Sequence, residues 1–203
     1  MKRGKQLKKY LWAFFVFPLV TIVLYGFVIQ SVTRPKREEK ISLFVGAYRD
    51  FGLEDALQAK RPDGIREVNV DFALLGSTSF RQQYRALWSN EDAILLPESQ
   101  LGDDPSALLN SFVSFSAETI NQLLPGEHTF YSWNSKLYGI QVFSQESEKG
   151  WGDNLLRYTQ EQVESENFYL FFVPTSPHLG NLVKDSHDAA IFSVLQTWEA
   201  IHE

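Results

Sequence analysis

Hydrophobic and polar positions divide the chain into a short basic tail, a long apolar stretch and a mixed region. The apolar stretch covers residues 10–30 and contains no charged side chain. At about 1.5 Å of rise per residue, a helix of this length would span roughly 30 Å, the thickness of a bilayer's hydrocarbon core. We therefore expect a transmembrane helix at residues 10–30, a polar linker at 31–40 and a folded domain at 41–203.

Two other interpretations of the apolar stretch fit it less well. A cleavable signal peptide usually has an apolar core of about 7–15 residues that ends at a small-residue cleavage site. This stretch is longer, and the sequence VIQSVTRPK at its end offers no A-x-A site. A buried core helix is the other alternative, but a helix that is apolar on every face and follows a lysine-rich tail fits a membrane span better. The sequence thus predicts an uncleaved signal anchor, with a kink favoured at Pro18 because proline lacks a backbone donor.

Charge predicts the orientation of this anchor. The tail at residues 1–9 carries five basic side chains and no acid, and short basic segments tend to remain in the cytoplasm. The flank at residues 31–40 has four basic residues, which Glu38 and Glu39 offset in part. We expect a single-pass protein of the cell membrane, with its N-terminus in the cytoplasm and its C-terminal domain outside.

Beyond the linker, strand-like and helix-like patterns alternate. Short apolar runs at residues 41–47, 68–75 and 93–96 predict three strands. Apolar positions at helical spacing predict helices at residues 51–60 and 80–88 between them. This alternation is typical of parallel strands joined by right-handed crossovers. The expected fold is α/β with a mainly parallel sheet.

The second half of the domain begins with a predicted hairpin. Strand-like runs at residues 130–133 and 136–143 flank the turn residues Asn134 and Ser135. Ser116 is well placed to cap a helix that follows it. The other predicted elements are helices at residues 117–124, 151–164 and from about 185 to 201, and a strand at 168–173.

Composition narrows the possible functions. Nine of the 19 basic residues but only two of the 25 acids lie in residues 1–40, so the predicted domain has a formal charge of −13. Nucleic acid is not an expected partner, because phosphate binding needs a basic face. The chain contains no cysteine, which excludes disulfides, cysteine zinc fingers, thiol catalysis and a lipid anchor on cysteine.

Catalytic signatures are missing from the sequence. It contains no G-x-S-x-G, phosphate-loop, H-E-x-x-H or G-x-G-x-x-G motif. We interpret the four histidines as surface or loop residues, and the acids at 103–104 and at 146 and 148 as solvated charges in polar loops. We therefore expect a protein that is not an enzyme and that uses no cofactor and no metal.

Loops at the carboxyl ends of the predicted parallel strands are better candidates for a binding surface, because ligands collect there in open α/β sheets. Tyr48 and Arg49 follow the first strand and offer a stacking ring and a forked donor, and Glu98 follows the third strand. Aromatic residues cluster around the hairpin turn, among them Trp133. Flat rings beside carboxylates and amides are a usual composition of carbohydrate sites.

Three stretches resemble parts of bacterial extracellular solute-binding proteins of sugar-type ABC importers. KISLFVGAYRDFG and VNVDFALLGSTSFRQQYRALWSNEDAILLPES are similar to the opening of those proteins. KLYGIQV at residues 136–142 is similar to their x-x-Y-G-[IV]-P-x segment, with Gln141 where proline is common. The resemblance covers most of residues 40–145. It implies one periplasmic-binding-protein-like lobe that binds a carbohydrate, and by position it assigns ligand binding to Tyr48, Arg49, Ser77, Glu98 and Trp133.

Two departures from that family affect the expected function. Its members have two lobes over about twice this length and are often anchored through a lipidated cysteine, whereas residues 41–203 suffice for about one lobe and the chain has no cysteine. The first hypothesis is a membrane-anchored solute-binding-like protein, with an oligosaccharide and an ABC permease as partners besides membrane lipid. The alternative is an accessory subunit that binds no ligand and docks to a membrane complex.

Overall fold

The computed structural model describes most of the chain, and it divides the chain into two compact units, Met1–Lys36 and Arg37–Glu203. Three predicted segments lie largely or wholly outside the described residues: the helix at 151–164, the C-terminal helix and most of 80–88. The described residues are 3–47, 52–75, 80, 82, 84, 90–123, 126–143 and 166–179.

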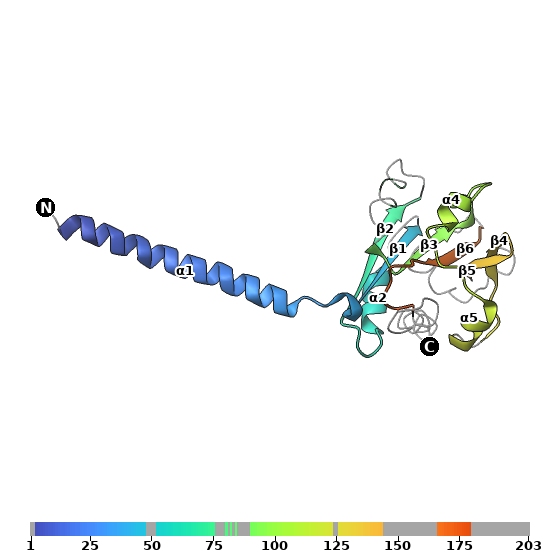
Figure 1. Cartoon of the computed structure of the whole chain (residues 1–203), viewed down its shortest axis with the longest axis horizontal. Helices are drawn as coiled ribbons and strands as arrows, with labels where there is room; N and C mark the ends of the chain where they lie inside the picture. The colour runs from blue at the N-terminus through green and yellow to red at the C-terminus, as the bar shows by residue number, and fades with distance from the viewer. Residues whose placement is uncertain are drawn as a thin grey trace. The chain divides into compact units, whose positions relative to one another are not determined.

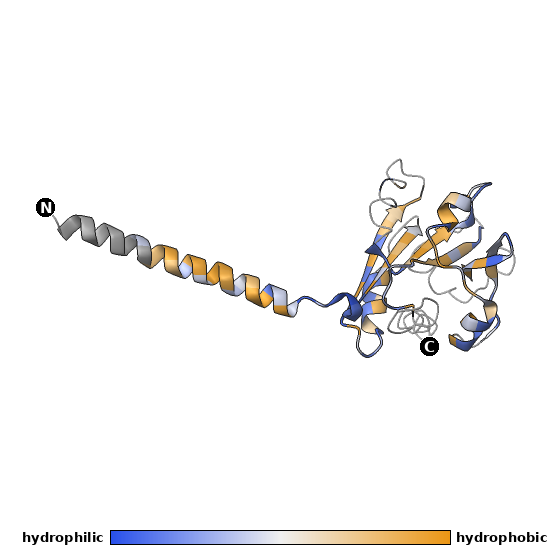
Figure 2. Ribbon diagram, viewed as in Figure 1, coloured by the Kyte–Doolittle hydropathy of each residue, from blue (hydrophilic) through white to orange (hydrophobic). Residues whose placement is uncertain are grey.

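The first unit is one helix, α1, which covers Arg3–Thr33 and so extends beyond both ends of the predicted span. Its segment Phe14–Thr33 has a mean hydropathy of 2.1 and is long and apolar enough to cross a membrane. In Figure 2 most of this segment is coloured as hydrophobic. Pro18 lies inside the helix, and the Thr21 hydroxyl donates to the carbonyl of Phe17 at 2.8 Å, which satisfies a polar group on an apolar helix.

The second unit is built on one mixed sheet of six strands in the order β2-β1-β3-β6-β5-β4 (Figure 1). β1 pairs in parallel with β2 and β3, whereas β6 pairs antiparallel with β3 and β5, and β5 with β4. The α/β class is confirmed. The strand bounds are β1 Lys40–Ala47, β2 Glu67–Leu74, β3 Ala93–Pro97, β4 Phe130–Trp133, β5 Lys136–Phe143 and β6 Phe168–Phe172.

The expectation of a mainly parallel sheet is wrong, because only two of the five neighbouring pairs are parallel. β4 and β5 are joined by a two-residue turn and must run antiparallel. β6 then lies between β3 and β5 and runs antiparallel to both. The continuous apolar run of β6 indicates burial on both faces, but it carries no information about strand direction.

In the parallel half, the predicted strand–helix–strand order is confirmed. Helix α2, Leu53–Ala59, buries Leu53 and Leu57 and connects β1 to β2. Side chains of α2 also bond to the outer edge of β2: Gln58 Oε1 accepts from the Val68 amide at 2.7 Å, and Glu54 Oε2 from the Val70 amide at 2.9 Å. These contacts occupy edge donors that would otherwise be open to pairing with another chain.

In the antiparallel half, the predicted hairpin is confirmed. Its turn residues Asn134 and Ser135 have φ values of 47° and 61°, the left-handed pair that a tight two-residue hairpin turn requires. Ser116 caps a helix as predicted, since its hydroxyl accepts from the Thr119 amide at 3.2 Å. Three short helices complete this half: η3 Glu98–Gln100, α4 Ser106–Leu109 and α5 Ala117–Leu123.

Aromatic rings fill the space over the antiparallel strands. Phe112 stacks on Phe171 with ring centroids 4.8 Å apart. Phe171 also lies against Gly139 of the neighbouring strand, where a Cβ would sit 2.9 Å from its ring. Glycine is therefore needed at this position because the ring occupies the space of a side chain.

The segment between the two units is short. Helix α1 ends at Thr33, and a 3-10 turn, η1 Arg37–Glu39, leads directly into β1. Residues 34–36 thus separate the apolar helix from the folded unit, where the sequence predicted a linker at 31–40.

Candidate functional site

The carboxyl ends of the parallel strands form the edge where a ligand is expected. β1 lies between β2 and β3, so the winding of the chain reverses at this point, which is where open α/β sheets bind ligands. The predicted residues Tyr48, Arg49 and Ser77 lie in loops outside the described residues. The described part of this edge is the segment after β3 together with the adjacent ends of β6, β5 and β4.

Glu98 is the first member of a hydrogen-bonded row of polar side chains across this edge. Its carboxylate accepts from the Asn167 side-chain amide at 2.7 Å, and its backbone amide donates to the Asn167 carbonyl at 2.8 Å. Asn167 in turn accepts from the side-chain amide of Gln141 at 3.0 Å. These contacts form because β6 brings residue 167 next to the end of β3, and β5 lies on its other side.

Two tyrosine rings complete this polar edge. Tyr131 of β4 is half-buried and Tyr169 of β6 is buried, and their centroids are 5.2 Å apart with the rings nearly perpendicular. Burial, and next the charge of Glu98, raise the pKa of the Tyr169 hydroxyl to about 12 and shift the pKa of Tyr131 in the same direction. Both hydroxyls therefore stay protonated near neutral pH. We call Glu98, Tyr131, Gln141, Asn167 and Tyr169 the tyrosine–glutamate cluster.

Trp133 is not part of this cluster. It pairs with Lys136 beside the hairpin turn, whereas Gln141 pairs with Tyr169 near the other end of β5. The Trp133 ring is half-buried against the core, and its enclosed indole N–H has no hydrogen-bond partner among the described residues. Of the two predicted site residues that the structure describes, Glu98 thus lies near Tyr131 and Tyr169, whereas Trp133 lies at the hairpin turn.

Sequence reasoning missed Asn167 and Gln141 and did not join Tyr169 to Glu98. Asn167 and Tyr169 are distant from Glu98 in the sequence and approach it only because β6 pairs antiparallel with β3. In the sequence, β6 is only an apolar run preceded by Asn167, and this pattern does not indicate that the strand pairs with β3. A rule that places polar residues flanking every buried strand among the candidates would have included Asn167.

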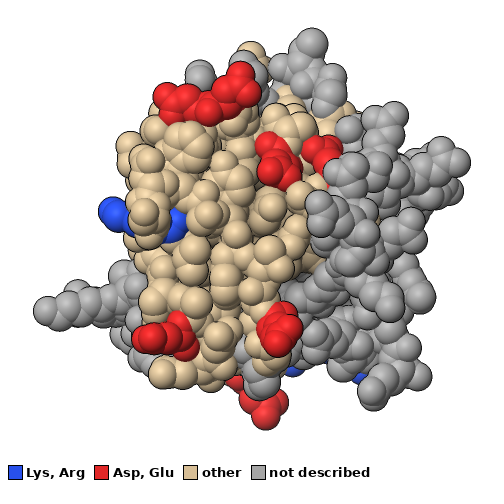
Figure 3. Space-filling model, turned by 90° about the vertical axis from the view of Figure 1, so that its right-hand side faces the viewer, with Lys and Arg blue, Asp and Glu red and all other residues tan. Residues whose placement is uncertain are grey.

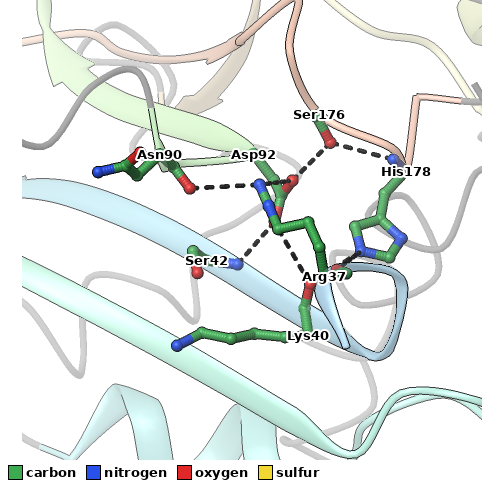
Figure 4. Close-up of polar contacts among 7 residues, drawn as sticks. All are labelled: Arg37, Lys40, Ser42, Asn90, Asp92, Ser176 and His178. Carbon is green, nitrogen blue, oxygen red and sulfur yellow. Dashed lines mark hydrogen bonds and ion pairs between the residues drawn. The ribbon is translucent and has the colours of Figure 1, made fainter. Parts of the chain in front are cut away.

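A second polar cluster lies at the opposite edge, where β1 and β3 begin (Figure 4). The Asp92 carboxylate is completely buried, and the Arg37 guanidinium donates to both of its oxygens, at 2.9 and 2.6 Å. The Ser42 amide donates to it at 2.7 Å and the Ser176 hydroxyl at 2.6 Å. We call Arg37, Ser42, Asp92, Ser176 and His178 the clasp, because they join three distant segments.

Serine, histidine and aspartate in one cluster are the residue types of a hydrolytic triad, but their geometry differs from one. Ser176 donates to Asp92 rather than to an imidazole, and His178 Nε2 donates to the Lys40 carbonyl at 2.8 Å. A triad requires the imidazole to accept the serine proton. The clasp is thus a structural joint. His178 lies in a loop, as predicted, but is buried rather than at the surface.

Glu91 lies next to the clasp and is almost completely buried. Burial, and next the nearby Asp71 carboxylate, raise the pKa of Glu91 to about 8, and its Oε2 has no hydrogen-bond partner among the described residues. Within the described ranges, no group of three or more His, Cys, Asp or Glu residues is placed to hold a metal ion.

Comparison with protein-family models, curated proteins and solved structures found no match for this chain.

Proposed function

We propose that the protein is a membrane-anchored, extracytoplasmic, solute-binding-like protein that takes part in carbohydrate uptake by an ABC transporter. Helix α1 is the anchor, the tail before it is cytoplasmic, and the second unit is outside the cell. The second unit acts as a single periplasmic-binding-protein-like lobe without catalytic activity. Its ligand is an oligosaccharide, held in part by the tyrosine–glutamate cluster.

The cluster carries this proposal. Tyr131 offers a half-exposed ring for stacking on a sugar face, while Glu98 and the two amides offer acceptors and donors for hydroxyl groups. The cluster lies at the carboxyl end of β3, beside the point where the winding of the sheet reverses. The succession β1-α2-β2 along the chain, followed by the parallel strand β3, also supports the proposal, because the resemblance to solute-binding proteins implies an opening of alternating strands and helices.

One observation favours a second candidate function. Glu98, Asn167 and Gln141 already bond to one another, so they need no ligand to satisfy their polar groups. A lobe with such a self-contained network would suit an accessory subunit that docks to a membrane complex without binding a sugar.

A sugar panel separates the two candidates. The full chain, held in a detergent without a sugar headgroup, is titrated with maltodextrins and other oligosaccharides while tryptophan fluorescence and thermal stability are measured. The solute-binding proposal expects a shift with at least one sugar, and Tyr131→Ala should weaken that sugar's binding by about tenfold or more, or about 1.4 kcal/mol. Trp133→Phe tests whether the site extends to the hairpin turn.

Tyr138→Ala is the matched control for Tyr131→Ala. Tyr138 is also a half-buried tyrosine of the hairpin, but it lies at the register shift of β5 and is not a member of the tyrosine–glutamate cluster. Equal losses in the two variants would contradict binding at the cluster. No response to any sugar, together with co-purification of a permease, would support the accessory function instead.

A further inference from the structure

The hydroxyl groups of α1 differ in how they are satisfied. Four residues of Phe14–Thr33 carry a hydroxyl, and three of them, Thr21, Ser31 and Thr33, donate to carbonyls of their own helix at 2.8, 2.9 and 2.7 Å. The fourth is Tyr25, which is exposed and whose hydroxyl has no hydrogen bond to any residue that the structure describes. A tyrosine hydroxyl stands at the far end of a rigid ring and cannot turn back to the preceding carbonyls as serine and threonine do. Its partner must therefore come from outside the helix.

The Tyr25 hydroxyl lies deep in the segment that would cross a membrane. Side chains of a helix point toward its N-terminus, so this ring covers the turn before its own Cα, at the height of Thr21. At 1.5 Å of rise per residue, Thr21 is within about 4 Å of the centre of Phe14–Thr33, whereas a bilayer's hydrocarbon extends about 15 Å to either side. If α1 spans a membrane, this hydroxyl is out of reach of water, and an unsatisfied polar group in hydrocarbon is costly.

Thr21 supplies an acceptor at this height. Its hydroxyl donates to the Phe17 carbonyl and keeps lone pairs that can accept a further hydrogen bond. Residues four apart lie on the same face of a helix, so Tyr25 and Thr21 present a donor and an acceptor on one side of α1. This face is therefore complementary to itself.

Two copies of the chain bring these groups together. Copies of one chain enter a cell membrane in the same orientation, so two α1 helices lie parallel, with equal residues at equal depth. In a two-fold symmetric pair, the Tyr25 hydroxyl of each copy meets the Thr21 hydroxyl of the other, which gives two equivalent hydrogen bonds. A helix of another protein would need an acceptor of its own at the same depth.

The same face has the residue spacing of a helix pair. Alternating steps of three and four residues connect Pro18, Thr21, Tyr25, Val28 and Val32. This is the a and d spacing of left-handed parallel pairs, in which a polar residue fixes the register. All five residues are exposed on α1. We call them the pairing stripe.

The folded units would not supply the attraction. Residues 41–203 have a formal charge of −13, and the face in Figure 3 shows acidic side chains and few basic ones. Two such units repel each other, most strongly at low salt. Association therefore depends on α1, whose segment Phe14–Thr33 contains no charged residue.

We propose that α1 forms a parallel pair with α1 of a second copy of the chain, joined by the Tyr25 hydroxyl of each copy donating to the Thr21 hydroxyl of the other. This inference rests on the membrane-spanning role of α1 proposed above, but not on sugar binding. Both folded units of the pair then stand on the same side of the membrane.

The test uses the full chain in phosphatidylcholine vesicles. The chain has no cysteine, so Asp63→Cys provides one position for a fluorophore in the exposed segment between α2 and β2. Donor-labelled and acceptor-labelled pools are mixed, and energy transfer is measured as added lipid dilutes the protein. Copies that insert in the opposite direction cannot pair, and they lower the signal equally in every variant.

Tyr25→Phe should raise the dissociation constant of the pair by about fivefold to tenfold, because it removes two hydrogen bonds of the strength found between membrane helices. Thr21→Val should have a similar effect, because it removes the acceptor and keeps the shape. The double variant should lose no more than either single variant, since both remove the same two bonds.

Tyr25→Phe combined with Phe27→Tyr is the matched control. It keeps the composition of α1 and moves the hydroxyl almost to the opposite side, because two residues turn about 200° around a helix. This variant should associate as weakly as Tyr25→Phe alone. Ser31→Ala removes a hydroxyl that is bonded within the helix and lies off the pairing stripe, so it should leave the dissociation constant unchanged.

Oxidative crosslinking locates the paired face. Val28→Cys and Phe27→Cys, each in the unlabelled chain, place a thiol at nearly the same depth, but only the first lies on the pairing stripe. Disulfide-linked dimers should form severalfold faster with Val28→Cys.

Three results would overturn the pair: energy transfer no greater than random proximity gives, an unchanged dissociation constant in Tyr25→Phe, or equal crosslinking at the two positions. The first would mean that a helix of a different protein meets the Tyr25 hydroxyl. In all three, flotation of the chain with the vesicles would leave the membrane span intact. A chain that does not float with them would overturn the membrane span itself, and the pair with it.

Discussion

The two halves of the sheet are held together by different interactions. At the base of the parallel half, the buried Asp92 carboxylate collects donors from two segments that are distant from it in sequence: Arg37 and Ser42 in one, and Ser176 in the other. In the antiparallel half, rings pack on rings, as in the stack of Phe112 on Phe171 and the edge contact of Tyr131 with Tyr169. Both halves have a buried apolar core, but the base of the first is also joined by charge and hydrogen bonding, whereas the second relies on the packing of large rings.

This difference shows how a short chain can fix two kinds of strand pairing in one sheet. Charged groups act where the folded unit begins, since Arg37, its first residue, pairs with the buried Asp92 carboxylate. Ring packing needs no charge, and it lies beside the tyrosine–glutamate cluster, where rigid placement of Tyr131 would matter for ligand binding. Substitutions that affect one kind of interaction should therefore leave the other half largely intact.

The largest effect is expected from Asp92→Ala. This change leaves the Arg37 guanidinium, the Ser42 amide and the Ser176 hydroxyl without their common acceptor. The Arg37 guanidinium is 38% exposed and can turn to water, but the buried Ser42 amide and Ser176 hydroxyl cannot, and each buried donor left unsatisfied costs about 1–3 kcal/mol. The urea midpoint of the full chain in detergent should fall accordingly, and hydrogen exchange should accelerate first in β1 and β3 rather than in the hairpin.

Lys40→Ala provides the comparison for this first prediction. It removes a partly exposed ion pair with Glu67 at the same edge, which should contribute less than about 1 kcal/mol. If the two variants lowered stability equally, the hydrogen bonds to Asp92 would contribute no more to stability than a partly exposed ion pair does.

Gly139→Ala should be the next most damaging change, and it acts on the other half. Its Cβ would lie 2.9 Å from the buried Phe171 ring, which Phe112 holds from another side. Overpacking of this kind costs about 1–3 kcal/mol. Urea unfolding should show the loss, while Ser132→Ala, an exposed change in the same hairpin, should stay within about 0.5 kcal/mol of the parent chain. A stable Gly139→Ala variant would show that the rings can move apart at little cost.

The parallel half should also make stability depend on pH, through the buried Glu91 carboxyl beside β3. The pKa of Glu91 is raised to about 8 in the folded chain, against an ordinary value of 4.5. Between these pH values the folded state keeps a proton that the unfolded chain has lost, so this residue makes stability fall as pH rises from about 4.5 to about 8.

Glu91→Gln should remove this slope, because the amide stays neutral throughout. The difference between pH 5 and pH 8 in the free energy of unfolding should shrink by roughly 3 kcal/mol relative to the parent chain, since nearly one proton is released over three pH units at about 1.4 kcal/mol each. Parallel urea titrations at the two pH values measure it. An unchanged slope in the variant would mean that Glu91 ionises normally in the fold.

Much of the fold could be predicted from the sequence because its signals are local. The hairpin turn at Asn134 and Ser135, the cap at Ser116 and the three parallel strands each follow from neighbouring residues, and each is confirmed. The direction and neighbours of β6 are long-range properties, and the apolar run FYLFFV is compatible with either direction.

The candidate site was predicted less well for the same reason. Glu98 was identified because it follows a strand, and its position at the carboxyl end of β3 is confirmed. Its contacts to Asn167 and its proximity to Tyr169 depend on the antiparallel neighbour, which the sequence did not reveal. The clasp was missed because an arginine–aspartate pair separated by 55 residues has no local signature.

The smallest effect is expected at the free edge of the parallel half. Gln58→Ala removes the acceptor for the Val68 amide and the donor to the Arg66 carbonyl, and solvent can replace part of each contact. The expected cost is about 1 kcal/mol. Hydrogen exchange at the Val68 amide should accelerate severalfold, while the hairpin amides should be unaffected. Gln122→Ala, an exposed glutamine on α5, is the matched control and should change neither measurement. If the Val68 amide exchanged at the parental rate in Gln58→Ala, solvent exclusion by the body of α2, and not this side-chain contact, would be what protects the outer edge of the sheet.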